Sequence, residues 1–475
     1  MVRALDGKQT EETRVKAVHE AFGQATSESD RIGVRTELMP QLWSRDAAPA
    51  LKVAIVEELL NEKAERSAQE VREELRLNLP LQNSREVVAV VCKAAAERKW
   101  AEFIPAIVRT WATPLGAVAD EARVERAALA ELAPERPVED TVFTVFTTPP
   151  TDTPATKRMR LEERYRLAAW EVLSRIDPSG ERRLALLGSV PAGTAAAPRP
   201  AFVDELLAAH AELGVLPGMG DELLWLRRLR DGKSQANAGW WAEAAAAVSG
   251  LPAEGRAGLE MRHLEALRWA SKVRPAWASS DRAGLEKEIA GRLADRPVYE
   301  ATGNRPSGRG RILESYKDAM PRMCWADLLA LLVVDEAVRS PGVAESLFTY
   351  AGYDERDTKT EYGGLIQAVD GDAARPFIAT LYAPRPGDRY DDRRFVASQD
   401  MVDASDRALL HWHFHVAERS NASYAGPSLE DLDYAGRQGR TCVVFTSLDS
   451  SKLDADYFQR GGVIVDLGVV RRPEK

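Results

Sequence analysis

The chain has 475 residues, of which 45% are hydrophobic, so it can bury two or three domain cores and is not a wholly disordered protein. Its formal net charge is −9, which argues against a general nucleic-acid binder, because such a protein needs a basic binding face. Composition therefore predicts a multidomain globular protein and leaves its activity open.

Roughly the first 300 residues are predicted to be helical, because apolar residues recur there at three- and four-residue spacing. Apolar stripes such as Leu51, Ile55 and Leu59 are typical of core packing and not of a cofactor site. Successive helical hairpins of about 35–45 residues suggest a HEAT- or TPR-like repeat architecture. The expected helices cover residues 36–44, 48–65, 69–78, 85–98, 202–213, 222–230, 240–248 and 259–271.

The second half of this helical region is rich in tryptophan. Burial in a core is the first interpretation of these residues, and a protein-binding face is the alternative. A helical platform of this kind would suit recruitment of a protein substrate or partner. The tryptophans are Trp225, Trp240, Trp241, Trp269 and Trp277.

Two segments are expected to separate the domains. Phe143-Thr144-Val145-Phe146, followed by Pro149-Pro150, predicts an extended linker. The arginine-rich run 304–311 lacks the Gly-Lys-Ser/Thr end of a phosphate-binding loop, so a hinge is expected there. The predicted organisation is a helical repeat-like domain at 1–132, a linker at 133–156, a second helical region at 157–302, a hinge with a connecting helix at 303–334, and a C-terminal domain at 335–475.

Several features point to a cytoplasmic protein. Cys92, Cys324 and Cys442 lie far apart and form neither a disulfide framework nor a cysteine metal motif, as expected in a reducing compartment. The polar start at 1–6 lacks the apolar region of a signal peptide. No apolar run approaches the roughly 18 residues that identify a membrane span.

The C-terminal domain contains the run Leu409-Leu410-His411-Trp412-His413-Phe414-His415-Val416, which holds three of the six histidines. Alternate side chains of a strand share a face, so the imidazoles would point one way and the apolar side chains the other. Neighbours on one face lie about 6.6 Å apart, so adjacent histidines can share one ion, whereas His411 and His415 are too far apart. The chelating pair is therefore His411 with His413, or His413 with His415. The alternative is a strand that presents its imidazoles to solvent.

Two further segments carry candidate carboxylates. Ser428 and Asp431 stand at the start of a predicted helix and share a face of its first turn. Taken alone, they predict a capping box. In the functional alternative, Asp431 is a third metal ligand and the Ser428 hydroxyl donates a hydrogen bond to a reacting oxygen. Glu361 precedes a Gly-Gly-Leu-Ile strand whose glycines allow close approach of another backbone, and taken alone it is typical of a surface carboxylate.

Taken together, Glu361 before its strand, His413-x-His415, and Ser428-x-x-Asp431 resemble the JAMM (JAB1/MPN+) family of zinc-dependent isopeptidases in residue type, order and spacing. The resemblance implies Zn²⁺ held by His413, His415 and Asp431, with a fourth position open to water. It also implies Glu361 as general base and Ser428 as a hydrogen-bond donor to the developing oxyanion.

The resemblance covers about residues 335–475 and implies an α/β fold of the MPN, cytidine-deaminase-like type. The chain differs from the family pattern at Val416, where proline is usual, in a longer loop over 416–427, and in the extra histidine His411. The expected function is hydrolysis of a peptide or isopeptide bond in a ubiquitin-like protein tail or conjugate. The composition, rich in Ala, Arg and Glu, is typical of a bacterial protein.

Two other interpretations stay open. His411-x-His413 followed by Glu418 matches the first metal motif of cupins, although cupins add a later histidine and none follows His415 here. The chain could instead be a non-catalytic helical-repeat interaction protein with a structural MPN-like domain. Such a protein has no need of the five site residues together, whereas a hydrolase needs each.

Overall fold

The structure is a computed structural model that describes residues 2–113, 118–154, 156–193, 199–230, 234–299, 314–418 and 420–474. The chain divides into two compact units, Met1–Pro191 and Ala192–Lys475. This division differs from the expected boundaries, because the helices between residues 199 and 299 belong to the same unit as the C-terminal sheet. The arginine-rich run 304–311 lies outside the described residues.

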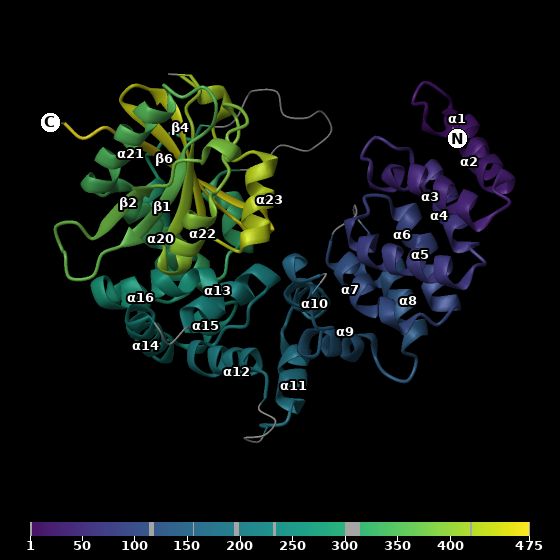
Figure 1. Ribbon diagram of the computed structural model, residues 1–475. Helices are drawn as coiled ribbons and strands as arrows, with labels where there is room; N and C mark the ends of the chain where they lie inside the picture. The colour runs from purple at the N-terminus through teal and green to yellow at the C-terminus, as the bar shows by residue number, and fades with distance from the viewer. Residues whose placement is uncertain are drawn as a thin grey trace. The chain divides into compact units, whose positions relative to one another are not determined.

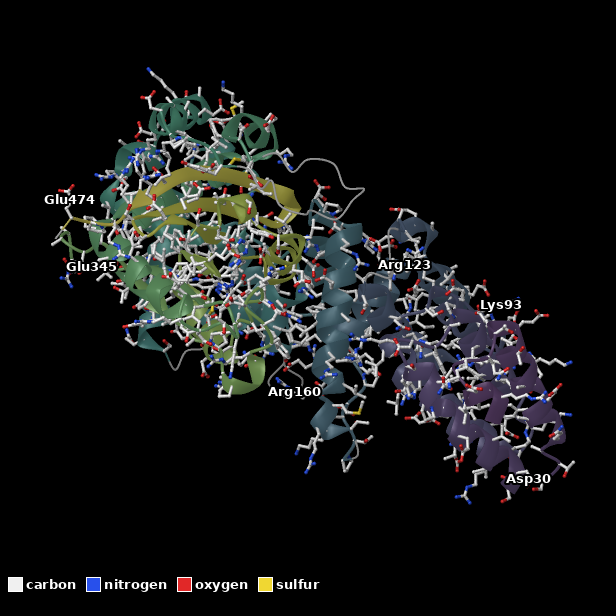
Figure 2. The ribbon with its side chains drawn as sticks, turned by 90° about the horizontal axis from the view of Figure 1, so that it is seen from above. Asp30, Lys93, Arg123, Arg160, Glu345 and Glu474 are labelled. Atoms are coloured by element: carbon white, nitrogen blue, oxygen red, sulfur yellow. The ribbon has the colours of Figure 1, made fainter. Side chains whose placement is uncertain are left out.

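The first unit is helical, as the apolar spacing predicts. The helix expected at 36–44 begins earlier, at Glu28, because Ser27 and Asp30 form a capping box there. Charged side chains such as Asp30 and Lys93 point away from the helices (Figure 2). The helices are α1 (Val2–Leu5), α2 (Glu11–Gln24), α3 (Glu28–Trp43), α4 (Pro49–Leu60), α5 (Glu65–Asn78), α6 (Arg85–Glu97), α7 (Ile104–Ala112), α8 (Val124–Leu132), α9 (Val138–Thr147), α10 (Leu161–Ile176) and α11 (Glu181–Ser189).

The prediction of an extended linker at 133–156 is wrong over its central part, which forms α9. β-branched and aromatic residues there favour a strand by propensity, but Val138, Val142 and Phe146 recur every four residues and are buried together. Phe146 packs against Trp170 of α10 with ring centroids 4.9 Å apart. Tertiary burial of one apolar face therefore overrides the local propensity.

The second unit begins with helices that pack onto the rest of the unit. Four of its tryptophans, Trp225, Trp240, Trp241 and Trp269, are buried, which confirms the core interpretation for them. Among the described helices, none combines the length and apolar character that crossing a membrane requires. The helices are α12 (Ala201–Leu213), α13 (Gly220–Arg230), α14 (Gln235–Ser249), α15 (Ala253–Arg256), α16 (Leu264–Val273), α17 (Pro275–Ala278), α18 (Arg282–Leu293), α19 (Tyr316–Ala319), α20 (Trp325–Arg339), α21 (Pro341–Asp354), α22 (Gln399–Ala404) and α23 (Leu429–Gln438).

A six-stranded mixed sheet, ordered β2-β1-β3-β4-β5-β6, forms the centre of the second unit. Its neighbouring strands are antiparallel except β3 and β4, which are parallel and are connected through α23. The strands are β1 (Gly363–Ala368), β2 (Phe377–Leu381), β3 (Leu410–His415), β4 (Cys442–Asp449), β5 (Lys452–Gln459) and β6 (Val463–Arg471).

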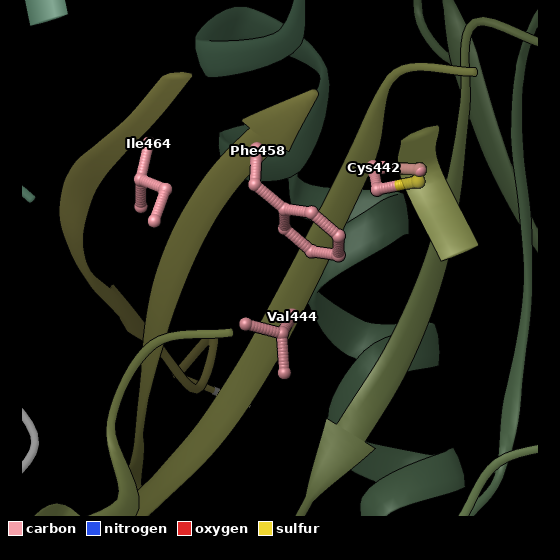
Figure 3. Close-up of a cluster of buried hydrophobic side chains, with 5 residues drawn as sticks. Cys442, Val444, Phe458 and Ile464 are labelled. Carbon is pink, nitrogen blue, oxygen red and sulfur yellow. The ribbon is translucent and has the colours of Figure 1, made fainter. Parts of the chain in front are cut away.

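Helices cover both faces of this sheet (Figure 1). On one face, Tyr350 of α21 stacks on Trp412 of β3 with ring centroids 5.9 Å apart. On the other face lies α23, whose Ala435 packs into a buried cluster with side chains of β4, β5 and β6. Figure 3 shows four members of that cluster, Cys442, Val444, Phe458 and Ile464.

Glu222 of α13 is expected to make the second unit less stable at alkaline pH. It is 1% exposed, and burial raises its pKa from 4.5 to about 7, outweighing the opposing effect of Arg460. The folded state therefore keeps a proton that the unfolded chain loses. This contribution to stability is complete below about pH 4.5 and declines as the pH rises to about 7, by on the order of 1 kcal/mol per pH unit.

Glu222→Gln removes this titration, so we expect its urea-unfolding midpoint to fall less than that of the wild type between pH 5 and pH 8. Glu254→Gln, at an exposed position, is the matched control and should behave as the wild type does. An unchanged pH dependence in Glu222→Gln would contradict this account of the buried carboxyl.

Candidate metal centre

The three histidines of β3 lie on the face of the sheet that α23 covers. His411 lies beside Tyr434 of α23, and His413 and His415 lie beside Asp431 at the start of the same helix. His411 is 3% and His413 6% exposed, so this strand does not present its imidazoles to solvent. Helix α23 reaches this face because it is the crossover between the parallel strands β3 and β4.

Strand pairing brings Glu361 to the same place. Gly363 of β1 is paired with His413 in the antiparallel register, and the backbone N–H of Phe414 donates to the carbonyl oxygen of Tyr362 at 3.0 Å. Continuing this register by one residue sets Glu361 opposite His415, with both side chains on one face. Gly363 permits the approach, because a Cβ at this position would lie 2.5 Å from the carbonyl oxygen of Trp412.

Asp431 forms the capping box, and its carboxylate also lies close to the histidine pair. It forms a capping box with Ser428, in which the Asp431 carboxylate accepts from the Ser428 backbone N–H at 2.7 Å and the Ser428 hydroxyl accepts from the Asp431 backbone N–H at 3.2 Å. The same carboxylate has one oxygen 3.1 Å from Nε2 of His413 and the other 3.5 Å from Nε2 of His415. The cap therefore fixes the orientation of the carboxylate toward the histidine pair.

These residues form a cluster that could hold a metal ion. One potential ligand atom of each of Glu361, His413 and His415 lies within 4.8 Å of the others, and the Asp431 carboxylate lies close to both histidines. The histidine pair within this group is His413 with His415. Among the described residues, neither His411 with His413 and Glu418 nor His413 with His415 and Asp431 forms a group whose ligand atoms all lie within 4.8 Å of one another, but Asp431 has one oxygen near each of the two histidines.

Hydrogen bonding prepares the two imidazoles for a cation. Nδ1 of His415 lies 3.3 Å from the carbonyl oxygen of Tyr424, which can only accept, so Nδ1 carries a hydrogen and Nε2 is the nitrogen that can bind an ion once its own proton is lost. Nε2 of His413 is buried and, among the described residues, has no hydrogen bond of ordinary geometry, although Asp431 is close. An ion between these atoms would satisfy both.

The charges of the cluster also favour a cation. Burial raises the pKa of Glu361 to about 8, although the charge of His415 opposes the rise. For His415, burial lowers the pKa, but the hydrogen bond to Asp431 and the charges of Glu361 and Asp431 outweigh it and raise the pKa to about 9. In the metal-free site, protons on Glu361 and His415 therefore supply positive charge that a bound divalent ion would supply instead.

A cleft of about 1290 Å³ gives access to these residues. It is lined by all five of the residues singled out from the sequence and by aromatic and charged side chains from the segment that precedes α22. Phe395 of that segment stacks on His413 with ring centroids 5.9 Å apart. Neither Phe395 nor the Tyr424 carbonyl carries a sequence signal, whereas Tyr434 could have been found from its three-residue spacing to Asp431.

His411 is held by the fold. Its Nδ1 lies 2.8 Å from the hydroxyl of Tyr434, and burial, followed by the charge of Arg440, lowers the pKa of His411 well below its usual value. The bond to the partly buried Tyr434 phenol accounts for Nδ1 of this histidine, whereas Nε2 is buried and has no hydrogen bond of ordinary geometry among the described residues.

Tyr434→Phe is therefore expected to destabilise the second unit by about 1–3 kcal/mol, because it leaves Nδ1 of His411 buried without a partner. Metal content should be unchanged. Denaturant unfolding and elemental analysis test the two statements, and Tyr424→Phe is the control, since the Tyr424 side chain is 46% exposed. Metal loss in Tyr434→Phe would give His411 a direct part in the site.

Comparison of the chain with family models, with curated proteins and with solved structures finds no match.

Proposed function

We propose that this protein is a zinc-dependent hydrolase of peptide or isopeptide bonds, with His413, His415 and Asp431 as the metal ligands. The observation that carries the proposal is the position of the Asp431 carboxylate, 3.1 Å from Nε2 of His413 and 3.5 Å from Nε2 of His415. Ligand atoms on a tetrahedral zinc with bonds of about 2.0–2.1 Å lie roughly 3.3 Å apart. Two imidazoles and one carboxylate are a ligand set of catalytic zinc sites, which keep the fourth position open.

The residues around the ligands supply the remaining chemistry. Bound zinc supplies a Lewis acid that polarises a carbonyl and makes water more acidic. Glu361 lies beside both histidines, so its carboxylate can take a proton there and pass it to the leaving amine. The Ser428 hydroxyl lines the cleft and, while accepting from Asp431, can still donate to a substrate oxygen.

The substrate class follows from the resemblance to the JAMM family and from the cleft. A volume of about 1290 Å³ is larger than a single side chain needs and suits an extended peptide segment. The resemblance implies the tail of a ubiquitin-like protein or a conjugate of one. The helices α2, α4, α6 and α8 pack in succession, which supports a repeat-like platform that recruits the substrate or a partner.

Metal content and hydrolysis of one preparation test the proposal. We expect close to one zinc per wild-type chain, much less in His413→Ala, and a normal amount in His210→Ala, which removes an exposed histidine of α12. Cleavage of a ubiquitin-like fusion should stop on chelation and return with zinc. Wild-type protein that takes up no zinc when it is offered would refute the proposal and favour a non-catalytic interaction protein.

A further inference from the structure

A second group of acidic side chains lies on the same face of the sheet as the histidines. Asp454 and Asp456 belong to β5 and Asp466 to β6, and one carboxylate oxygen of each lies within 4.8 Å of the others. Their exposed fractions are 0%, 0% and 5%. The register pairs His413 with Val444, Val444 with Asp456, and Asp456 with Asp466, so the group lies about 10 Å from the histidines, two strands away.

Most of the oxygens in this group lack a hydrogen-bond partner. Asp466 accepts from the backbone N–H groups of Tyr299 and Gly468, which hold it in place. Among the described residues, no hydrogen bond of ordinary geometry reaches either carboxylate oxygen of Asp454 or of Asp456. These four buried oxygens have lost water without gaining a hydrogen bond of ordinary geometry in exchange, which is costly for an ionised group.

An uncharged side chain on the same face also lacks a hydrogen-bond partner among the described residues. The hydroxyl of Thr446 in β4 is fully buried and has no partner among the described residues. Thr446 is directly opposite Asp454 in the antiparallel register, so its side chain shares the face and adjoins the carboxylate. Thr446 therefore places a second kind of oxygen donor on this face, on the residue paired with Asp454.

Among the described residues, Arg339 is a cation near this group, and its guanidinium is already occupied. Arg339 of α20 lowers the pKa of Asp454 and Asp466 only weakly, after burial and neighbouring carboxylates have raised it, to about 8 for Asp454. Its guanidinium donates to Asp335 and to the carbonyl oxygens of Leu467 and Val469. Glu314, also fully buried, adds a further negative charge beside the group.

We propose that Asp454, Asp456 and Asp466, with the Thr446 hydroxyl beside them, bind a hard divalent cation of the Ca²⁺ or Mg²⁺ class. Only oxygen donors are offered, which these ions prefer and which zinc prefers less than nitrogen or sulfur. The three carboxylate oxygens lie within 4.8 Å of one another, so one ion with Ca–O bonds of roughly 2.3–2.6 Å can reach them all. The cation ties β5 to β6 and is independent of the proposed zinc site and of hydrolysis.

Binding can be measured on the full chain with the histidine site disabled. The double variant His413→Ala/Asp431→Ala, stripped by a chelator, is titrated separately with Ca²⁺, Mg²⁺ and Mn²⁺ while Tm is followed. Mn²⁺ is also counted by electron paramagnetic resonance. We expect about one bound Mn²⁺ per chain, and a rise in Tm on the order of 5 °C with the preferred ion. The relative midpoints of the Ca²⁺ and Mg²⁺ titrations identify that ion.

Adding Asp456→Asn should abolish both the bound Mn²⁺ and the Tm shift. Asp433→Asn is the matched control, because its carboxylate is 65% exposed, and it should leave both unchanged. If Asp456→Asn does not fold, Asp466→Asn takes its place. No bound Mn²⁺ and no shift with any of the three ions would overturn the proposal, as would full binding in Asp456→Asn.

Discussion

Glu361→Gln is expected to lower kcat for cleavage of a ubiquitin-like fusion by about 100- to 10,000-fold while leaving the zinc content unchanged. Glutamine keeps the size of the side chain and its burial, so the strand pairing that sets Glu361 opposite His415 is preserved. It cannot take up a proton, which is the role proposed for this carboxylate. Steady-state kinetics and elemental analysis of the same preparation provide the measurement.

Glu418→Gln is the matched control for this experiment. Glu418 lines the same cleft but is exposed and lies outside the convergent cluster, so its kinetics should resemble those of the wild type. Two results would contradict the assignment of Glu361. Normal turnover in Glu361→Gln would remove it from the chemistry, and loss of zinc would make it a ligand, a position that its distance from the histidines also permits.

Asp431→Ala should weaken zinc binding by more than about 100-fold, since loss of a direct ligand exceeds the 10- to 100-fold cost of losing an outer hydrogen bond. It should also destabilise the start of α23, because the same carboxylate accepts from the Ser428 backbone N–H. Competition with a chelator of known affinity measures the first effect, and denaturant unfolding of the metal-free protein measures the second.

Ser428→Ala separates these two contributions. It removes the hydroxyl that accepts from the Asp431 backbone N–H, at a cost of about 0.5–2 kcal/mol, but leaves the Asp431 carboxylate in place. Zinc affinity in Ser428→Ala should therefore stay within a few fold of that of the wild type. Equal losses of zinc in the two variants would mean that the helix start, and not the carboxylate, determines binding.

The sequence was most informative where the pattern was local. Alternation in β3 placed the imidazoles on one face, and the apolar spacing predicted α3, α4, α5, α6, α12, α13, α14 and α16. The choice between His411 and His415 as the partner of His413 could not be made, because it depends on where α23 crosses the sheet. Asp431 shows a related limit: a capping box and a metal ligand were weighed as alternatives, and one carboxylate has the geometry of both.

Elements that depend on distant contacts were missed. β5 was not expected, because Asp454 and Asp456 alternate with Leu453 and Ala455 in a way that resembles an exposed edge, yet both faces of this strand are buried. The domain boundary was misplaced for a similar reason. The helices that follow Ala192 show ordinary amphipathic spacing, and nothing local reveals that they pack in the same unit as the sheet.

The parallel pairing of β3 with β4 has a consequence for how the site is divided along the chain. His413, His415 and Asp431 all belong to one contiguous strand–helix–strand segment, whereas Glu361 arrives by antiparallel pairing with a strand from earlier in the sequence. Under the proposed assignment, the segment from β3 to β4 supplies all the metal ligands, and the segment that leads into β1 supplies the general base. Weakening the pairing of β1 with β3 would therefore remove Glu361, and with it the catalytic activity. The segment from β3 to β4 would keep its metal ligands, and the ion would then have a structural role only.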